Sequence, residues 1–324
     1  MLSTGLSPEP DPGRPTERTQ GNDAVLGTPP ASRPALPAFA RFVIALAYAY
    51  VANRFAAGLV APFDFRHPLL ADLAYRMIAS AFLLGGFFLM LRVLDENDGP
   101  AWQALTLPFE RHSLRLITLG FFIGALLMSL DVLVVSTVGG MTFHFHLNSH
   151  TPGRVLIVVL LLAFGALLEE LGFRGYPFQR LLESVGPVWA IVVFSALFSA
   201  VHLANPENGG FWSWSFANTL LVGVLFAIAF LRTRSLWLPI GIHFGWNFFQ
   251  GTVFGLPVSG IQDFSVVIRS ALHGSHALTG GAYGPEDSAT CAVVLLLGFA
   301  VVVLCTPTRA AEAKQGSEAE LPRI

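Results

Sequence analysis

Six polar side chains stand in three strongly apolar stretches of the sequence and could together carry chemistry: Glu169, Glu170, Arg174, His202, His243 and Asn247. An ionisable side chain inside a membrane segment costs about 2.5–3.5 kcal/mol at mid-depth, so its presence there points to function. An unpaired carboxylate suits a general base, and an imidazole or a carboxamide can hydrogen-bond a substrate atom. These residue types therefore predict a site with one base and several hydrogen-bonding partners for a substrate.

Glu169 is the candidate base because of the spacing around it. On a helix, the side chains of Glu169 and Glu170 point about 100° apart, so they cannot share one partner. Glu170 and Arg174 have the i,i+4 spacing of an intrahelical ion pair, which leaves Glu169 without a local partner. The alternative is that all three charged groups form a solvated face in the headgroup region.

The histidines favour a site over a solvated face. His243 and Asn247 are four residues apart, so on a helix they project from one face and could meet the same substrate atom. His202 ends another apolar segment, just before Asn205 and Pro206. A single buried histidine is usually a hydrogen-bonded core residue. Two of them, together with an acid pair and an asparagine, indicate a functional cluster.

The composition places the whole chain in a membrane. Hydrophobic residues make up 53% and charged residues 12%, where a soluble globular chain has about 25% charged residues. The mean hydropathy is +0.61 and the net charge is −2, which offers no basic face for nucleic acid. This excludes a soluble enzyme, a secreted disulfide scaffold and a nucleic-acid binder. We expect an all-α polytopic membrane protein in contact with the lipid bilayer.

Eight apolar stretches approach the spanning length of about 20 residues: residues 38–60, 73–94, 114–138, 154–182, 187–204, 216–232, 235–255 and 289–306. We expect a transmembrane domain over residues 38–306, a disordered cytoplasmic tail at 1–37 and a cytoplasmic tail at 307–324. With both tails inside, twelve Lys and Arg side chains fall on the inner side and four, including Arg76, on the outer side. This bias agrees with the positive-inside rule.

The three polar stretches can meet only if their side chains reach one depth. If the helix over residues 154–182 is continuous, with a kink near Pro177, Glu169 lies about 20 Å from its inner end. By the same count, His202 and His243 lie about 22 Å and about 14 Å from the inner ends of their own helices. We therefore expect the three side chains to share a layer between the membrane midplane and the cytoplasmic side.

The polar clusters, taken in order, resemble the three signature motifs of a known family of intramembrane proteases: Glu169-Glu170-x-x-x-Arg174, Phe198-x-x-x-His202 and His243-x-x-x-Asn247. This is the CPBP family (CAAX protease and bacteriocin-processing), also called the Abi or type II CAAX prenyl endopeptidase family. The resemblance covers about residues 154–250, where we expect the protease core.

The resemblance implies a helical intramembrane endopeptidase that cleaves a peptide bond of a membrane-associated peptide or protein. Glu169 would activate the attacking water, and His202 would help to bind or polarise it. His243 and Asn247 would donate to the oxyanion of the tetrahedral intermediate. Glu170 would pair with Arg174 and keep the helix in register.

The cofactor and the substrate are left open by the sequence. Glu169, His202 and His243 could bind zinc with an open position for water, which would make the enzyme a metalloprotease. The close spacing of helical zinc motifs such as H-E-x-x-H is missing, however, and a metal-free water explains the same residues. The resemblance implies a substrate of the CAAX type or a bacteriocin-like peptide. The Arg-rich and Ala-rich composition favours a bacterial cytoplasmic (inner) membrane.

Two other kinds of function use the same polar cluster, namely a non-catalytic membrane scaffold and a small-solute transporter. Outside the cluster, the alternating histidines of residues 143–150 (His144, His146 and His150) are expected in a polar loop, with a metal-binding strand as the alternative. Asn53 either lines a cavity or makes a contact between helices. Gly120 and Gly124 predict a close helix contact.

Overall fold

The computed structural model describes residues 36–65, 68–145, 151–266 and 268–306. The two expected tails lie outside these residues, apart from Leu36 and Pro37, and so do His146 and His150. The described residues are mostly helical, which confirms the all-α fold class.

The helices follow one another along the chain as α1 (Ala38–Val60), α2 (Pro68–Val93), α3 (Ala101–Ala104), α4 (Arg111–Thr137), α5 (Thr151–Arg174), α6 (Tyr176–His202), α7 (Trp214–Thr233), α8 (Trp237–Asn247), α9 (His276–Thr279) and α10 (Ala289–Cys305). A π-helical turn, Phe248–Val253, extends α8, and a 3₁₀ turn, Pro285–Asp287, precedes α10. Two short strands, β1 (Met141–Phe145) and β2 (Ile268–Leu272), pair antiparallel.

All eight apolar stretches contain helix, and five helical stretches in the described residues are long and apolar enough to cross a membrane: Ala38–Val60, Pro68–Val93, Arg111–Thr137, Pro152–His202 and Trp214–Thr233. The Pro152–His202 stretch runs through both α5 and α6, while α8 and α10 are shorter. The chain is therefore a polytopic membrane protein, but the expected count of eight spans is not confirmed.

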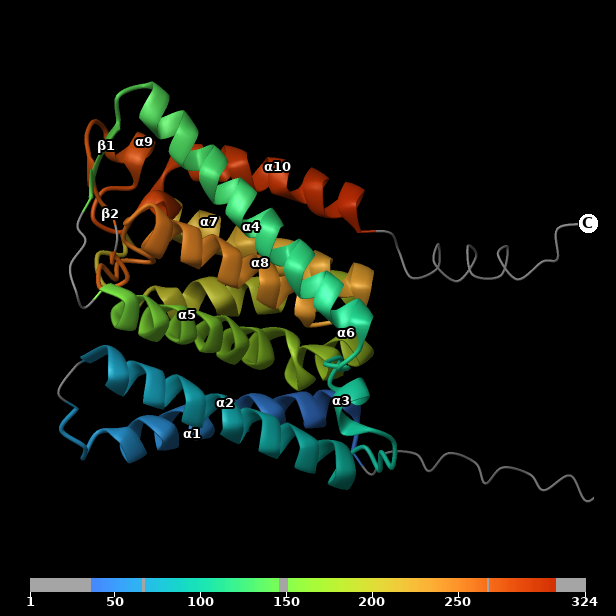
Figure 1. The fold of residues 1–324 in the computed structure, drawn as a ribbon. Coiled ribbons are helices and arrows are strands. Elements are labelled where there is room, and N and C mark those ends of the chain that lie inside the picture. The colour runs from blue at the N-terminus through green and yellow to red at the C-terminus, as the bar shows by residue number, and fades with distance from the viewer. Residues whose placement is uncertain (1–35, 66–67, 146–150, 267, 307–324) are drawn as a thin grey trace, which may run out of the picture. The chain divides into compact units, whose positions relative to one another are not determined.

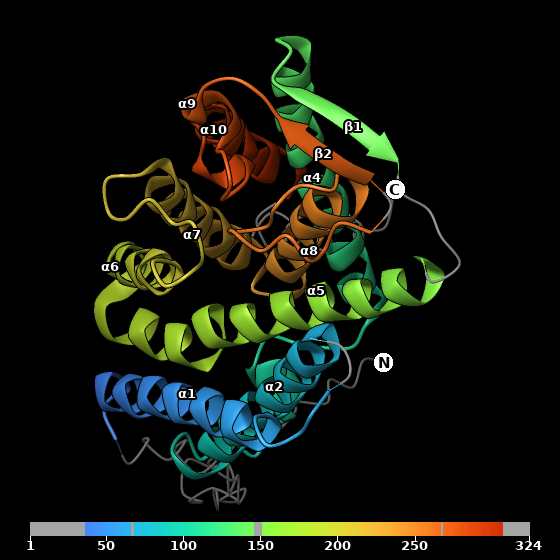
Figure 2. The ribbon, with the colours of Figure 1, turned by 90° about the vertical axis from the view of Figure 1, so that its left-hand side faces the viewer.

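Helix α5 lies between two groups of helices. Helices α1 and α2 pack on one side of it, and α6, α7, α8, α4 and α10 lie on the other (Figures 1 and 2). Because α5 contacts α2, α6 and α8, its side chains can reach residues from both groups. This central position brings the acid pair of α5 close to the distant histidines.

The expected continuous helix over residues 154–182 is wrong. Helix α5 ends at Arg174, and Gly175 has non-helical backbone angles. Pro177 then occupies the first turn of α6, where a missing N–H costs nothing; inside a helix it would also clash with the preceding turn. A second break follows at Gly186, whose φ of 78° lies in the left-handed region that glycine adopts without strain.

The break between α5 and α6 is held by a network of ion pairs around Asp95. This carboxylate accepts from Arg41, from Arg180 at 2.8 Å and from the Tyr176 hydroxyl at 2.9 Å. Arg180 also pairs with Glu183 at 2.7 Å. The network ties α1 and the end of α2 to the start of α6, which stabilises the turn that follows the acid pair.

The loop expected at residues 143–150 is also wrong in its first part, because His144 lies in strand β1, opposite Arg269 of β2. The partner strand is more than 120 residues away in the sequence, and four of the five β1 residues are exposed. The segment therefore carries no alternation of buried and exposed residues that would have predicted a strand.

The predicted close contact at Gly120 and Gly124 is confirmed, and it joins α4 to α8. A Cβ atom at Gly124 would collide with the Ile242 carbonyl oxygen and the Trp246 backbone nitrogen, and one at Gly120 with the Leu238 carbonyl. Glycine is needed here because the two backbones touch. The contact sets the position of α8, which carries His243.

We expect Gly124→Leu to destabilise the fold by about 1–3 kcal/mol or more, because the new side chain meets backbone that cannot move aside. The folded yield and thermal stability in detergent would both fall. Gly85→Leu in α2 is the matched control, since a Cβ there has nothing within 4 Å. Equal stability of the two variants would contradict the proposed packing role of Gly124.

Candidate active site

A cavity of about 670 Å³ lies where α5, α6 and α8 meet, and four of the six predicted site residues line it: Glu169, His202, His243 and Asn247. The other two, Glu170 and Arg174, are completely buried behind its wall. Structure and sequence thus agree on which polar groups come together, although they belong to three separate helices.

Glu169 faces both imidazoles. Its Oε2 atom lies 3.9 Å from Nε2 of His202 and 3.8 Å from Nε2 of His243. Within the described residues this oxygen has no hydrogen-bond partner, although it is buried. The gaps are too long for direct hydrogen bonds, but a single water molecule can bridge groups at such a separation.

His202 is oriented by its own helix. Its Nδ1 lies 2.7 Å from the carbonyl oxygen of Phe198, one turn earlier in α6. A carbonyl oxygen only accepts, so Nδ1 must carry the proton. In the neutral ring, Nε2 is then a free acceptor that faces Glu169.

His243 is oriented by Glu170 instead of by its own helix. Its Nδ1 donates to Glu170 Oε1 at 3.1 Å, and the same oxygen accepts from Arg174 Nη1 at 3.3 Å. The ion pair expected from the i,i+4 spacing is therefore present and also holds an imidazole. Because Nδ1 keeps its proton and donates it in this hydrogen bond, Nε2 donates only when the ring carries both protons, a form that the two nearby carboxylates stabilise.

The guanidinium of Arg174 is fully enclosed. It lies 4.6 Å from the ring centre of Phe198 and 5.2 Å from that of Phe226, and its Nη2 donates to the Gly223 carbonyl of α7 at 3.0 Å. Cation–π contacts and a charge-assisted hydrogen bond offset part of its desolvation. Arg174 thereby links α5 to α6 and α7 around the acid pair.

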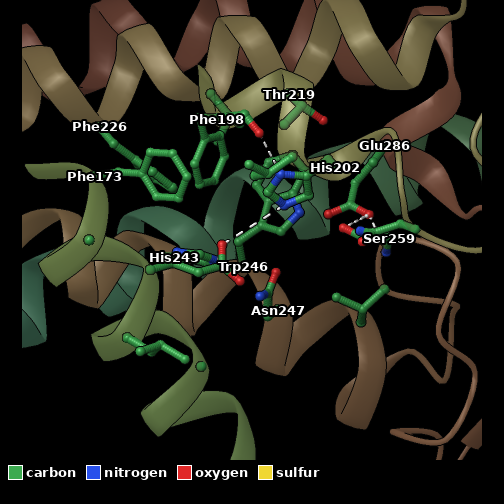
Figure 3. Close-up of a pocket in the computed structure, with 18 of the residues that line it drawn as sticks. Phe173, Phe198, His202, Thr219, Phe226, His243, Trp246, Asn247, Ser259 and Glu286 are labelled. Atoms are coloured by element: carbon green, nitrogen blue, oxygen red, sulfur yellow. Dashed lines mark hydrogen bonds and ion pairs between the residues drawn. The ribbon is translucent and has the colours of Figure 1, made fainter. Parts of the chain in front are cut away.

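Asn247 is the last residue of α8, one turn after His243 and directly before the π-helical turn. Figure 3 shows its amide and the His202 ring directed into the same space, with Phe198 on one side and Glu286 on the other. The carboxamide can therefore donate to an atom held near His202 and Glu169.

The metal site that the sequence left open finds no support in the described residues. Among the described residues, no group of three or more His, Cys, Asp or Glu side chains is arranged to hold a metal ion. Glu169 lies 3.9 Å from His202 and 3.8 Å from His243, but this grouping does not form such a ligand set.

Two charged residues of the cavity were not predicted as site residues. Arg76 was expected on the outer side of the membrane, but it lies within α2 and lines the cavity. The sequence feature that could have identified Arg76 is Asp72, an acid four residues earlier in the same helix. Glu170 and Arg174 have the same i,i+4 spacing.

Glu286, in the 3₁₀ turn before α10, is the other unpredicted residue of the cavity. It accepts from the Ser259 backbone at 2.5 Å and from the Ser259 hydroxyl at 3.0 Å. Burial raises the pKa of its carboxyl group. No local pattern in the glycine-rich segment around it marked this acid, because its contacts come from a loop 27 residues away.

Asn53 both lines the cavity and makes a contact between helices, the two alternatives that the sequence left open. It lines the cavity, and its Oδ1 accepts from the Tyr75 hydroxyl at 2.9 Å, which joins α1 to α2. The contact fixes one edge of the cavity next to Arg76.

The apolar spans and the buried acid–imidazole cluster define a polytopic membrane protein with an enzyme-like site. Residues 151–249 match the family described as type II CAAX prenyl endopeptidase Rce1-like, and this segment contains all six predicted site residues. Over this segment the chain is similar to that family of membrane proteases, in agreement with the resemblance that the sequence motifs indicated.

One curated relative is the uncharacterized protein YyaK of Bacillus subtilis (strain 168), which is 24% identical over 192 residues. The alignment covers 56% of this chain, and the chain spans about 60% of the length of that relative. No solved structure matches the chain significantly.

Proposed function

We propose that this protein hydrolyses a peptide bond of a membrane-associated peptide or protein, using a water molecule activated by Glu169. The observation that carries the proposal is the Glu169 carboxylate, which faces Nε2 of both His202 and His243 inside a cavity of a membrane protein. The similarity of residues 151–249 to a family of membrane proteases supports the same reaction class.

The attacking water would lie between Glu169 and His202. Its two protons would point to Glu169 Oε2 and His202 Nε2, both of which are acceptors when the imidazole is neutral. As water attacks the scissile carbonyl, Glu169 takes one proton and later passes it to the leaving amine. One carboxylate can perform both steps because it has no Lys or Arg partner within ion-pair distance among the described residues.

The negative charge that develops on the carbonyl oxygen would be stabilised by Asn247 and His243. The carboxamide donates without any change of charge, whereas His243 donates through Nε2 in its doubly protonated form. Glu170, already bonded to Nδ1 of that ring, stabilises the imidazolium. Arg174 pairs with Glu170 at 3.3 Å and holds its carboxylate in place.

Several finer features belong to the same proposal. The protease core would occupy about residues 154–250, and both termini would lie on the cytoplasmic side of a bacterial inner membrane. The substrate would be a CAAX-type protein or a bacteriocin-like peptide.

Asn247→Ala tests the oxyanion role. Loss of one donor is expected to lower kcat about 10²–10³-fold, with a smaller change in KM. The assay uses the purified protein in liposomes with apolar peptides, and mass spectrometry in ¹⁸O-labelled water detects the label in the new carboxylate. Asn97→Ala is the control, because Asn97 lies in the connection after α2 and is not among the residues that line the cavity.

The same assay separates the protease from a scaffold or a transporter. A scaffold or transporter would leave all peptides intact and unlabelled. An Asn247→Ala variant with unchanged kcat would remove this residue from the catalytic machinery.

A further inference from the structure

Arg76 is a cation inside the cavity with an unused binding edge. It lies in α2, lines the same cavity as Glu169, and its side chain is 18% exposed. A charged group in an apolar membrane helix costs free energy of insertion, and such groups usually face the bundle interior, where they serve a function. The catalytic proposal above makes no use of it.

The hydrogen bonds of Arg76 leave one side of its guanidinium free. Nε donates to Asp72 Oδ1 at 3.1 Å, one turn earlier in α2. Within residues 36–65, 68–145, 151–266 and 268–306, Nη1 and Nη2 donate to no protein acceptor. Asp72 therefore orients the guanidinium from the side, and the edge formed by Nη1 and Nη2 stays available.

The neighbouring helix leaves room for this guanidinium. A Cβ atom at Gly165 of α5 would collide with Arg76 Nη1, so any other residue there would push the cation away. Gly165 precedes Glu169 by four residues and thus lies on the same helix face. Arg76 and Glu169 carry opposite charges and line the same cavity.

We propose that the Nη1–Nη2 edge of Arg76 binds a carboxylate of the substrate. A planar guanidinium with two parallel N–H donors matches a carboxylate in a bidentate pair, which is stronger and more specific than a bond to a neutral carbonyl. This inference rests on the proposed protease function, because it assigns a specificity-determining residue to that site.

The position of Arg76 also predicts where the carboxylate stands in the substrate. Glu169 follows Gly165 by four residues on the helix, a rise of about 6 Å. An extended peptide covers about 3.3 Å per residue, so the carboxylate lies about two residues from the cleaved bond. It belongs either to the C-terminus of the substrate or to an acidic side chain at that position.

The test measures peptide binding rather than cleavage, in the Glu169→Gln background. Three forms of one fluorescent apolar peptide are compared: a free C-terminal carboxylate, a C-terminal amide, and an amide with a Glu side chain near the C-terminus. We expect at least one carboxylate form to bind about 10–100-fold more tightly than the plain amide. The form that binds identifies the source of the carboxylate.

Arg76→Gln is expected to remove this preference, and Arg76→Lys to retain part of it as a point charge. Arg54→Gln is the matched control, because Arg54 is an exposed arginine of α1 outside the cavity lining. Equal binding of all three peptides, or a preference that survives Arg76→Gln, overturns the inference. A carboxylate preference in a wild-type protein that cleaves no peptide would sink the protease proposal and leave Arg76 as an anion-binding residue.

Discussion

Replacing Glu169 by Gln is expected to lower peptide cleavage about 10²–10⁴-fold, the range for a positioned general base. The carboxamide has nearly the same shape but cannot take a proton from water. Because Glu169 Oε2 makes no hydrogen bond within the described residues, its replacement breaks no contact that holds the fold. The loss should appear in kcat, while folded yield and thermal stability stay close to those of the wild type.

The measurement compares single-turnover cleavage in liposomes for wild-type protein and Glu169→Gln at equal amounts of folded protein. Thr219→Ser is the control, because it is a conservative change at another cavity residue and leaves the Glu169 carboxylate intact. Full cleavage by Glu169→Gln would show that another group activates the water and would end the mechanism proposed here.

Glu170→Ala is expected to lower the free energy of unfolding by about 3–5 kcal/mol, the cost of removing one partner of a buried ion pair. Glu170 is completely buried and accepts from both Arg174 and His243. Its removal leaves the Arg174 guanidinium uncompensated in a low dielectric and frees the His243 ring to rotate. Folded yield should fall, and any protein that folds should have lost activity through the misplaced imidazole.

Glu183→Ala is the matched control for this variant. Glu183 also pairs with an arginine on a nearby turn, but its side chain is 45% exposed. An exposed ion pair contributes about 0–1 kcal/mol, so thermal unfolding in detergent should change little. If Glu170→Ala were as stable as Glu183→Ala, the pair with Arg174 would be dispensable for folding.

The membrane class and the identity of the polar cluster could be read from the sequence because both rest on local properties. Long apolar stretches identify the helices whatever their neighbours are, and an acid or a histidine inside such a stretch stands out against it. The pairing of Glu170 with Arg174 is local too, since it depends only on helical spacing.

The helix boundary at Arg174 could be predicted only in part from the sequence. Pro177 signalled a disturbance, but whether a proline kinks a helix or begins a new one depends on what packs around it. Here the ion-pair network of Asp95 holds the start of α6, and its members come from three separate segments.

The hydrogen bonds and packing contacts of the polar cluster could be found only from the tertiary structure. Glu170 bonds to a histidine 73 residues away, and strand β1 pairs with a strand more than 120 residues further along the chain. Arg76 enters the cavity because α2 packs on α5 at Gly165. Such contacts follow from the packing of whole helices. No short-range spacing pattern in the sequence reveals them. The residue types thus determined what chemistry is available, and the helix packing determined which atoms face one another to perform it.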